Sequence, residues 1–208
     1  MPPKIRGLEK QHLIVTEGRD DQIVVEGLAA REWASHVQVM HCQGRDNLEN
    51  KIRAVAAEPG FRSLVSLGIV LDAEESAAAT QTSIEAALKA AGLGSGTDQP
   101  RVRMHVVQRP DGKGMMEDIC LASLSGRPVM ECVDAYLRCC NERGQPDPAN
   151  PSKARFQTWL SSQPLKRGQP YFLGSAIELG LLDVGHPAFD PLRAFVREVA
   201  EVPVGKTQ

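Results

Sequence analysis

Acidic side chains follow two apolar runs of this 208-residue chain, in a pattern suited to binding a divalent cation. The first run leads to Glu17 and Asp21, and the second leads to Asp72 and Glu74. Short apolar runs of this kind are typical of buried parallel strands, and ligands bind at the carboxyl edge of an open α/β sheet. If the two strands are neighbours, the four carboxylates converge and repel one another unless a cation lies between them. Because oxygen is the ligand atom that Mg²⁺ and Mn²⁺ prefer, we expect one of these ions as the cofactor.

A third acidic element comes after a later apolar run. Glu117 and Asp118 follow a turn at residues 109–114 and begin a short predicted helix. Acids also suit the first turn of a helix for electrostatic reasons, so the position alone does not assign them to a metal site.

Strands and helices alternate through the first part of the chain. This alternation predicts an α/β fold with a mainly parallel, four-stranded sheet that is flanked by helices. Periodicity and turn signals place the strands at 12–17, 37–41, 64–71 and 102–107, and helices at 20–31, from Asn47 onward, and at 76–91.

From Pro128 the pattern changes to helices without intervening strands. We therefore predict an α/β core over residues 1–124 and a helical C-terminal extension over residues 125–208 that packs on it. Within the extension Ser152 is the expected N-cap of a helix that ends near Leu160. The extension could cover the site, bind a partner protein or form a homo-oligomer.

Composition excludes several classes of protein. There is no run of roughly 20 apolar residues, so no membrane-spanning helix is expected, and the first residues lack the apolar core of a signal peptide. The five cysteines have no Cys-x-x-Cys spacing, which favours reduced thiols in the cytoplasm over zinc binding or disulfides. Cys132 and Cys139 are expected in the core, and Trp33 and Trp159 are expected to pack rather than to stack on bases.

A net charge of −2 argues against binding nucleic acid by bulk attraction, but the charge is unevenly distributed. A solvated face is one interpretation of the basic stretch near the C-terminus, and a surface for a phosphodiester backbone is the other. The stretch has six basic residues against the acids Glu142 and Asp147: Arg138, Arg143, Lys153, Arg155, Lys166 and Arg167.

The acidic motifs resemble those of the Toprim domain of topoisomerases, primases and overcoming-lysogenization-defect nucleases. The resemblance is greater to the standalone Toprim-like family DUF3226, and it covers about residues 12–198. It rests on the Glu17-Gly-Arg-Asp-Asp21 motif, Gln43-Gly-Arg-Asp-Asn47, Asp72-x-Glu74, Arg109-Pro-Asp, Gly114-Met-Met-Glu117-Asp118 and Lys153.

The resemblance implies a Mg²⁺ or Mn²⁺ site whose metal ligands match Glu17, Asp21, Asp72, Glu74 and Glu117. It also implies catalytic roles for Glu17 and for a late lysine, for which Lys153 is the candidate and Lys113 the runner-up. One position departs from the family pattern, since the second acid of Asp-x-Asp is here a glutamate, which changes where its oxygens lie.

Three functions remain open at this stage. The first is metal-dependent phosphodiester chemistry on nucleic acid by an endonuclease of DNA or RNA, with DNA favoured as the substrate. The second is a non-catalytic module that binds metal and nucleic acid or nucleotide and acts with a partner protein. The third is a receiver-like phosphoacceptor at Asp72, which is disfavoured by Glu74 and by the lack of a lysine after a fifth strand.

Overall fold

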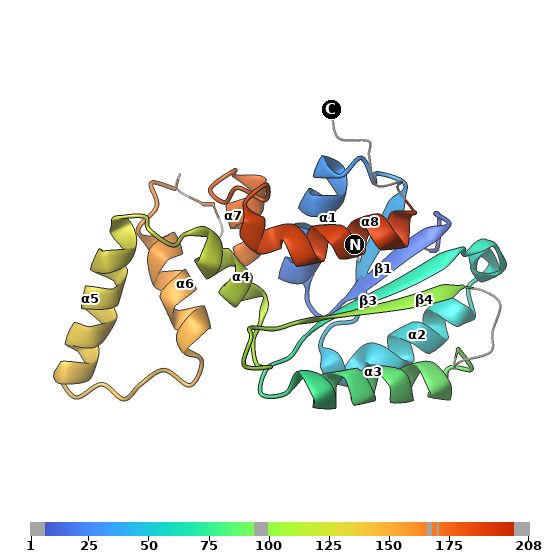
Figure 1. The fold of residues 1–208 in the computed structure, drawn as a ribbon, viewed down its shortest axis with the longest axis horizontal. Coiled ribbons are helices and arrows are strands. Elements are labelled where there is room, and N and C mark those ends of the chain that lie inside the picture. The colour runs from blue at the N-terminus through green and yellow to red at the C-terminus, as the bar shows by residue number, and fades with distance from the viewer. Residues whose placement is uncertain (1–6, 94–99, 166–167, 170, 202–208) are drawn as a thin grey trace.

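The computed structural model describes residues 7–93, 100–165, 168–169 and 171–201. Within these residues a single four-stranded sheet has the order β2-β1-β3-β4, and every neighbouring pair is parallel. The predicted α/β class with a parallel, helix-flanked sheet is therefore confirmed (Figure 1). The strands are β1 (His12–Thr16), β2 (Val37–His41), β3 (Ser66–Asp72) and β4 (Arg101–Val107).

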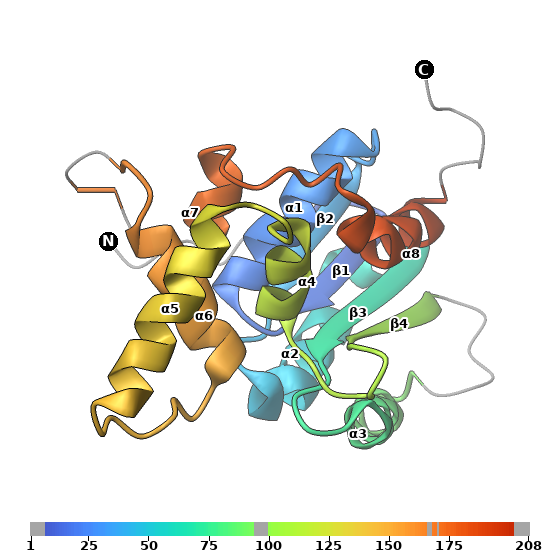
Figure 2. The same cartoon turned by 60° about the vertical axis from the view of Figure 1, so that its left-hand side comes forward.

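The helices divide between the two faces of the sheet, with α2 and α3 on one face and α1 and α8 on the other (Figures 1 and 2). The described helices are α1 (Arg19–Arg31), α2 (Leu48–Ala56), α3 (Ala77–Ala90), α4 (Met116–Ser123), α5 (Val129–Glu142), α6 (Pro151–Ser161), α7 (Leu173–Glu178) and α8 (Asp190–Ala200), with short 3₁₀ turns η1 (Arg45–Asn47), η2 (Pro59–Ser63) and η3 (Pro187–Phe189).

The central strands are buried on both faces, which explains their unbroken apolar sequences. In β1 the side chains of Leu13 and Val15 join the core under α2 and α3, whereas Ile14 joins the core under α1 and α8. Alternation along a strand thus places successive residues in different cores.

Helix α8 lies close against the sheet at Gly68 of β3. A Cβ atom at Gly68 would lie 2.8 Å from Val199 Cγ2 and 3.0 Å from Phe195 Cζ, so only glycine allows this approach. At the end of α8 the hydroxyl of Ser66 donates a hydrogen bond of 2.6 Å to the Val199 carbonyl, and His12 Nδ1 lies 2.8 Å from the same hydroxyl.

Helices α5 and α6 pack on each other beyond the carboxyl ends of the strands, and α4 joins them to the sheet (Figure 1). Helix α7 packs on α1, where the Gly174 N–H donates a hydrogen bond of 3.1 Å to Asp20 Oδ1. The carboxyl edge of the sheet is consequently surrounded by elements from the second half of the chain.

Local details differ from the sequence-based predictions. The N-cap of α6 is Asn150, whose side chain accepts a hydrogen bond from Lys153 N, so the expected cap at Ser152 is wrong. Helix α7 was not predicted. The apolar core shared by α1, α4, α5, α6, α7 and α8 extends across residue 124, and a division of the chain at that residue stays a prediction.

The structure also bears on the predicted burial of cysteine and tryptophan residues and on the question of membrane-spanning helices. Cys132, Cys139 and Trp33 are exposed rather than packed in the core, while Trp159 is buried as expected. Across the described residues, none of the helices has the length and apolar character to cross a bilayer. Lys166 and Arg167 of the basic stretch lie outside the described residues.

Candidate functional site

The five acids singled out as metal ligands all lie at the carboxyl edge of the sheet. Glu17 follows β1, Asp72 is the last residue of the neighbouring strand β3, and Glu74 comes two residues later. Asp21 is in the first turn of α1, and Glu117 is in the first turn of α4. Parallel pairing of β1 with β3 brings Glu17 and Asp72 to adjacent strand ends.

Four of the five carboxylates affect one another electrostatically. Burial, and after it the charges of Asp21, Glu17 and Glu117, raise the pKa of Asp72 to about 9. Burial also raises the pKa of Asp21 and of Glu117, although Lys153 acts in the opposite direction on both. Four acids therefore share a partly desolvated space in which full ionisation is unfavourable.

Burial and neighbouring acids act on Glu17 as well, but Glu17 has a cation beside it. Burial raises its pKa, and the charge of Arg45 is the largest opposing effect. Asp21 and Glu74 raise the pKa further. The proton affinity of Glu17 thus depends on how closely the Arg45 guanidinium approaches.

Arg45 reaches into the acidic cluster from η1, after β2. Its Nη2 donates a hydrogen bond of 2.5 Å to the carbonyl of Asp72, its Nη1 lies 3.4 Å from Glu74 Oε2, and its Nε lies 3.9 Å from Glu17 Oε2. That Nε and Glu17 Oε2 are both buried, and neither has a hydrogen-bond partner. The guanidinium is near enough to reduce repulsion among the acids, but it does not satisfy Glu17.

Two carboxylates are also fixed by backbone donors. Gly18 N donates a hydrogen bond of 2.8 Å to Asp21 Oδ2, and Met116 N donates one of 3.0 Å to Asp72 Oδ1. Both donors precede or begin a helix, where backbone N–H groups are otherwise unpaired. The first bond fixes Asp21 at the start of its own helix α1, and the second holds the amino end of α4 against the end of β3.

Glu74 differs from the other acids in position and backbone. It adopts φ 49°, a left-handed conformation uncommon for a non-glycine residue, and it pairs with Gly114 through hydrogen bonds in both directions of 2.8 and 3.0 Å. Its side chain is 54% exposed. Such outliers persist where the surroundings impose them, here the bridge to Gly114.

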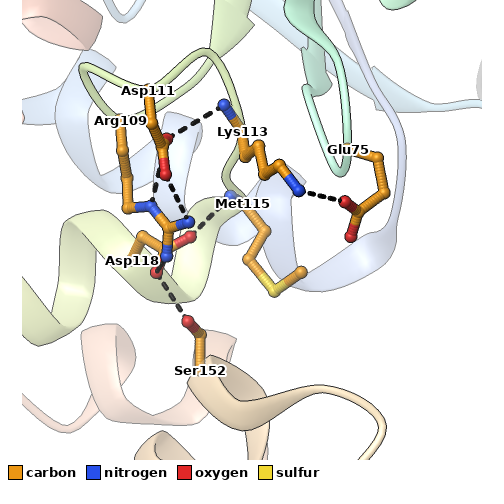
Figure 3. Close-up of polar contacts among 7 residues, drawn as sticks. All are labelled: Glu75, Arg109, Asp111, Lys113, Met115, Asp118 and Ser152. Carbon is orange, nitrogen blue, oxygen red and sulfur yellow. Dashed lines mark hydrogen bonds and ion pairs between the residues drawn. The ribbon is translucent and has the colours of Figure 1, made fainter.

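The two lysine candidates have different surroundings. Lys153, at the start of α6, lies near enough to Asp21 and Glu117 to lower the pKa of each. Lys113 instead places its Nζ 2.6 Å from Glu75 Oε2, an exposed acid outside the cluster (Figure 3). Lys153 is the lysine whose charge reaches the acids.

Asp118 connects three segments of the chain. Its Oδ2 accepts a hydrogen bond from Met115 N at 2.9 Å, and its Oδ1 accepts one of 2.6 Å from the Ser152 hydroxyl (Figure 3). Arg109 Nη1 lies 3.5 Å from the same oxygen. Both oxygens are thus used to cap α4 and hold it against α6, which distinguishes Asp118 from its neighbour Glu117.

The donor chemistry of the cluster fits a hard divalent cation. All candidate donors are carboxylate oxygens, burial and the neighbouring acids raise the pKa of Asp72, and a buried oxygen of Glu17 has no hydrogen-bond partner. In the described residues, no group of three or more His, Cys, Asp or Glu side chains is already arranged to hold a metal ion. Binding would therefore require these side chains to reorient.

One residue of the site was only weakly indicated by sequence. Arg45 follows Gly44 after β2, in the motif Gln43-Gly-Arg-Asp-Asn47, and its place in the sequence suits a turn as well as a pocket. The pairing of β2 with β1 is what places Arg45 at the acids. Gly44 N donates a hydrogen bond of 3.0 Å to the Glu17 carbonyl, which brings Arg45 next to the acidic cluster.

Fold and site together define an α/β protein with a four-stranded parallel sheet and an acidic cluster at its carboxyl edge. Residues 11–201 match a family described as "Protein of unknown function (DUF3226)", and the chain belongs to that family. No match was found among curated proteins.

Three solved structures are similar to the chain, all of the C-terminal region of the Xanthomonas campestris pv. campestris OLD protein. The forms phased with mercury, iodine and platinum have 12%, 11% and 12% sequence identity and TM-scores of 0.48, 0.47 and 0.49. Each alignment covers 93% of this chain, and the shares of the other chain are 97%, 97% and 95%.

Proposed function

We propose that the protein is a Toprim-type endonuclease that hydrolyses phosphodiester bonds in DNA with Mg²⁺ or Mn²⁺. The observation that carries this proposal is the burial of Asp72 among three further carboxylates, which raises its pKa to about 9. A buried carboxylate of this kind is costly without a partner, and perturbed acids grouped at one edge are typical of functional sites.

In this proposal Glu17, Asp21, Asp72 and Glu117 hold the metal, with Glu74 at its outer side. A bound divalent ion would lower the pKa of a water molecule and neutralise charge at the phosphate. Glu17, whose pKa is raised by burial, is suited to accept a proton from the attacking water near neutral pH. Lys153, whose charge lowers the pKa of Asp21 and of Glu117, supplies positive charge toward the phosphate oxygens.

The experiment combines calorimetric titration of Mg²⁺ and Mn²⁺ with a plasmid-cleavage assay on the same samples. Wild type is expected to bind the metal and cut, whereas Asp72→Asn and Glu17→Gln lose both activities and remain folded by circular dichroism. Glu75→Gln is the matched control, because Glu75 is adjacent in sequence to Glu74 but pairs with Lys113. Cleavage that survives in both cluster variants would contradict the proposal.

A second candidate is a non-catalytic module that binds metal and nucleic acid or nucleotide and acts with a partner protein. The observation that favours it is Glu74, which replaces the usual aspartate, is half-exposed and is paired with Arg45. Metal binding and DNA binding without cleavage of any nucleic acid would support this module against the nuclease.

A further inference from the structure

Three basic side chains lie beside the acidic cluster, at the carboxyl end of the edge strand β2. Arg19 is the first residue of α1, His41 is the last residue of β2, and Lys51 is in α2. All three line one open cavity of about 570 Å³ that runs along β2. Because His41 pairs in register with Thr16, it lies one strand away from Glu17.

These basic groups are not neutralised by the protein. In the part of the chain that the structure describes, neither Arg19 nor Lys51 makes an ion pair or a side-chain hydrogen bond. Within the described residues, His41 Nδ1 is buried and has no hydrogen-bond partner. Burial, and after it the nearby charges of Lys51 and Arg19, lower the pKa of His41, which favours the neutral imidazole.

The opposite flank of the acidic cluster differs. Beside β4, Arg109 lies 3.0 Å from Asp111 Oδ2, and Lys113 lies 2.6 Å from Glu75 (Figure 3). Their charges are compensated locally by Asp111 of the same loop and by Glu75 of the loop that follows β3. Among the described residues, Arg109 and Lys113 on the β4 side of the acids are therefore paired, whereas Arg19 and Lys51 on the β2 side are not.

We propose that Arg19, His41 and Lys51 form a binding subsite for a phosphate group adjacent to the scissile one, so that the bound DNA strand leaves the acidic cluster across the end of β2. This assignment rests on the proposed function. An arginine can hold two oxygens of one phosphate, and a lysine supplies a mobile point charge, so the pair matches a phosphodiester backbone without reading its bases.

The test measures binding of a fluorescein-labelled single-stranded DNA by anisotropy, with Ca²⁺ in place of the catalytic metal. Arg19→Gln/Lys51→Gln is expected to weaken binding about tenfold and to reduce the slope of log K on log salt by about 1 to 2. Lys89→Gln is the matched control, since Lys89 is an exposed lysine in the last turn of α3, and it should change the affinity less than about twofold.

A second measurement locates the contact. A neutral methylphosphonate replaces the phosphate on either the 5′ side or the 3′ side of the scissile phosphate. In wild type, only one of these two replacements should weaken DNA binding, and in the double variant the two should have equal effects. Equal affinities of the double variant and Lys89→Gln, or no asymmetry in wild type, would overturn the subsite.

Metal calorimetry and plasmid cleavage separate this inference from the proposed function. Cleavage by wild type with no effect of the double variant on affinity contradicts the subsite and leaves the nuclease intact. A tenfold loss of affinity in the double variant without cleavage by wild type supports phosphate binding by Arg19 and Lys51 and contradicts the nuclease.

Discussion

Arg45 acts as a covalently attached cation within the acidic cluster. It is close to Glu17 and Glu74, yet its Nε and Glu17 Oε2 remain buried without hydrogen-bond partners. A divalent ion bound by the same acids would compete with the guanidinium for these oxygens. The residue therefore has two expected effects, stabilisation of the metal-free protein and a lower apparent affinity for metal.

Arg45→Gln is expected to reduce the stability of the metal-free protein by about 1–2 kcal/mol, because acids that are partly buried lose their cation. Chemical denaturation in EDTA measures this, and calorimetry should show equal or tighter Mg²⁺ binding. Arg53→Gln is the control, because Arg53 forms an exposed pair with Glu49 that is expected to contribute less than about 1 kcal/mol. Similar losses in the two variants would show that Arg45 has no special role.

Asp72 should make the metal-free protein less stable at high pH. Its folded-state pKa of about 9 lies above the ordinary value of 3.8, so its contribution is complete at low pH and is lost as the pH rises toward 9. Urea unfolding in EDTA between about pH 6 and pH 9 should show a decline that is smaller by about 3–4 kcal/mol in Asp72→Asn. Asp111→Asn, at an exposed position, should keep the wild-type decline, and an unchanged slope in Asp72→Asn would contradict the assignment.

At the scale of elements, one side chain connects the start of α4 with the start of α6. Asp118 accepts hydrogen bonds from Met115 N and from the Ser152 hydroxyl, and it lies near Arg109. Since α4 carries Glu117 and α6 carries Lys153, this junction sets the distance between an acid of the cluster and the lysine nearest to it.

Asp118→Ala is expected to destabilise the protein by about 1–3 kcal/mol, because the helix cap and two further contacts are lost together. Thermal unfolding measures the loss. Glu131→Ala on the exposed side of α5 should change stability by less than about 0.5 kcal/mol. If Asp118→Ala behaves like this control, the junction does not hold the helices.

Sequence patterns predicted the strands and the parallel sheet because two-sided burial imposes continuous apolar runs on β1 and β3. The acids at their carboxyl ends followed from that prediction. The patterns did not predict α7, which has six residues, nor the cap of α6, since Asn150 and Ser152 are both good capping residues. Asp118 and Glu117 are adjacent acids with different surroundings, and only three-dimensional contacts separate them.

At the scale of the whole molecule, the acids, Arg45 and Lys153 come from segments spread over most of the chain. The order of the strands brings together the segments that follow β1, β2 and β3. The positions of α4 and α6 depend instead on packing beyond the sheet. A ligand held by all of them would connect the two halves of the protein and stabilise the folded state as a unit.

Mg²⁺ or Mn²⁺ at about one hundred times its dissociation constant is expected to stabilise the protein by about 2.7 kcal/mol, since only the folded state assembles the acids. Differential scanning calorimetry with and without EDTA measures the shift in Tm. The shift should disappear in Asp72→Asn and persist in Glu75→Gln. An equal shift in both variants would mean that the ions bind elsewhere.

The contact between Val199 and β1 has a consequence for how this protein is made. His12 and Val199 are separated by 187 positions, yet they share a hydrogen-bonded junction on one face of the sheet. During translation, α1 can cover part of that face early, but the part under α8 stays uncovered until α8 has been synthesised, which leaves apolar side chains such as Val70 incompletely buried in the nascent chain. Folding that depends on such distant contacts is slow and prone to aggregation, and we expect the growing chain to be a client of ribosome-associated chaperones.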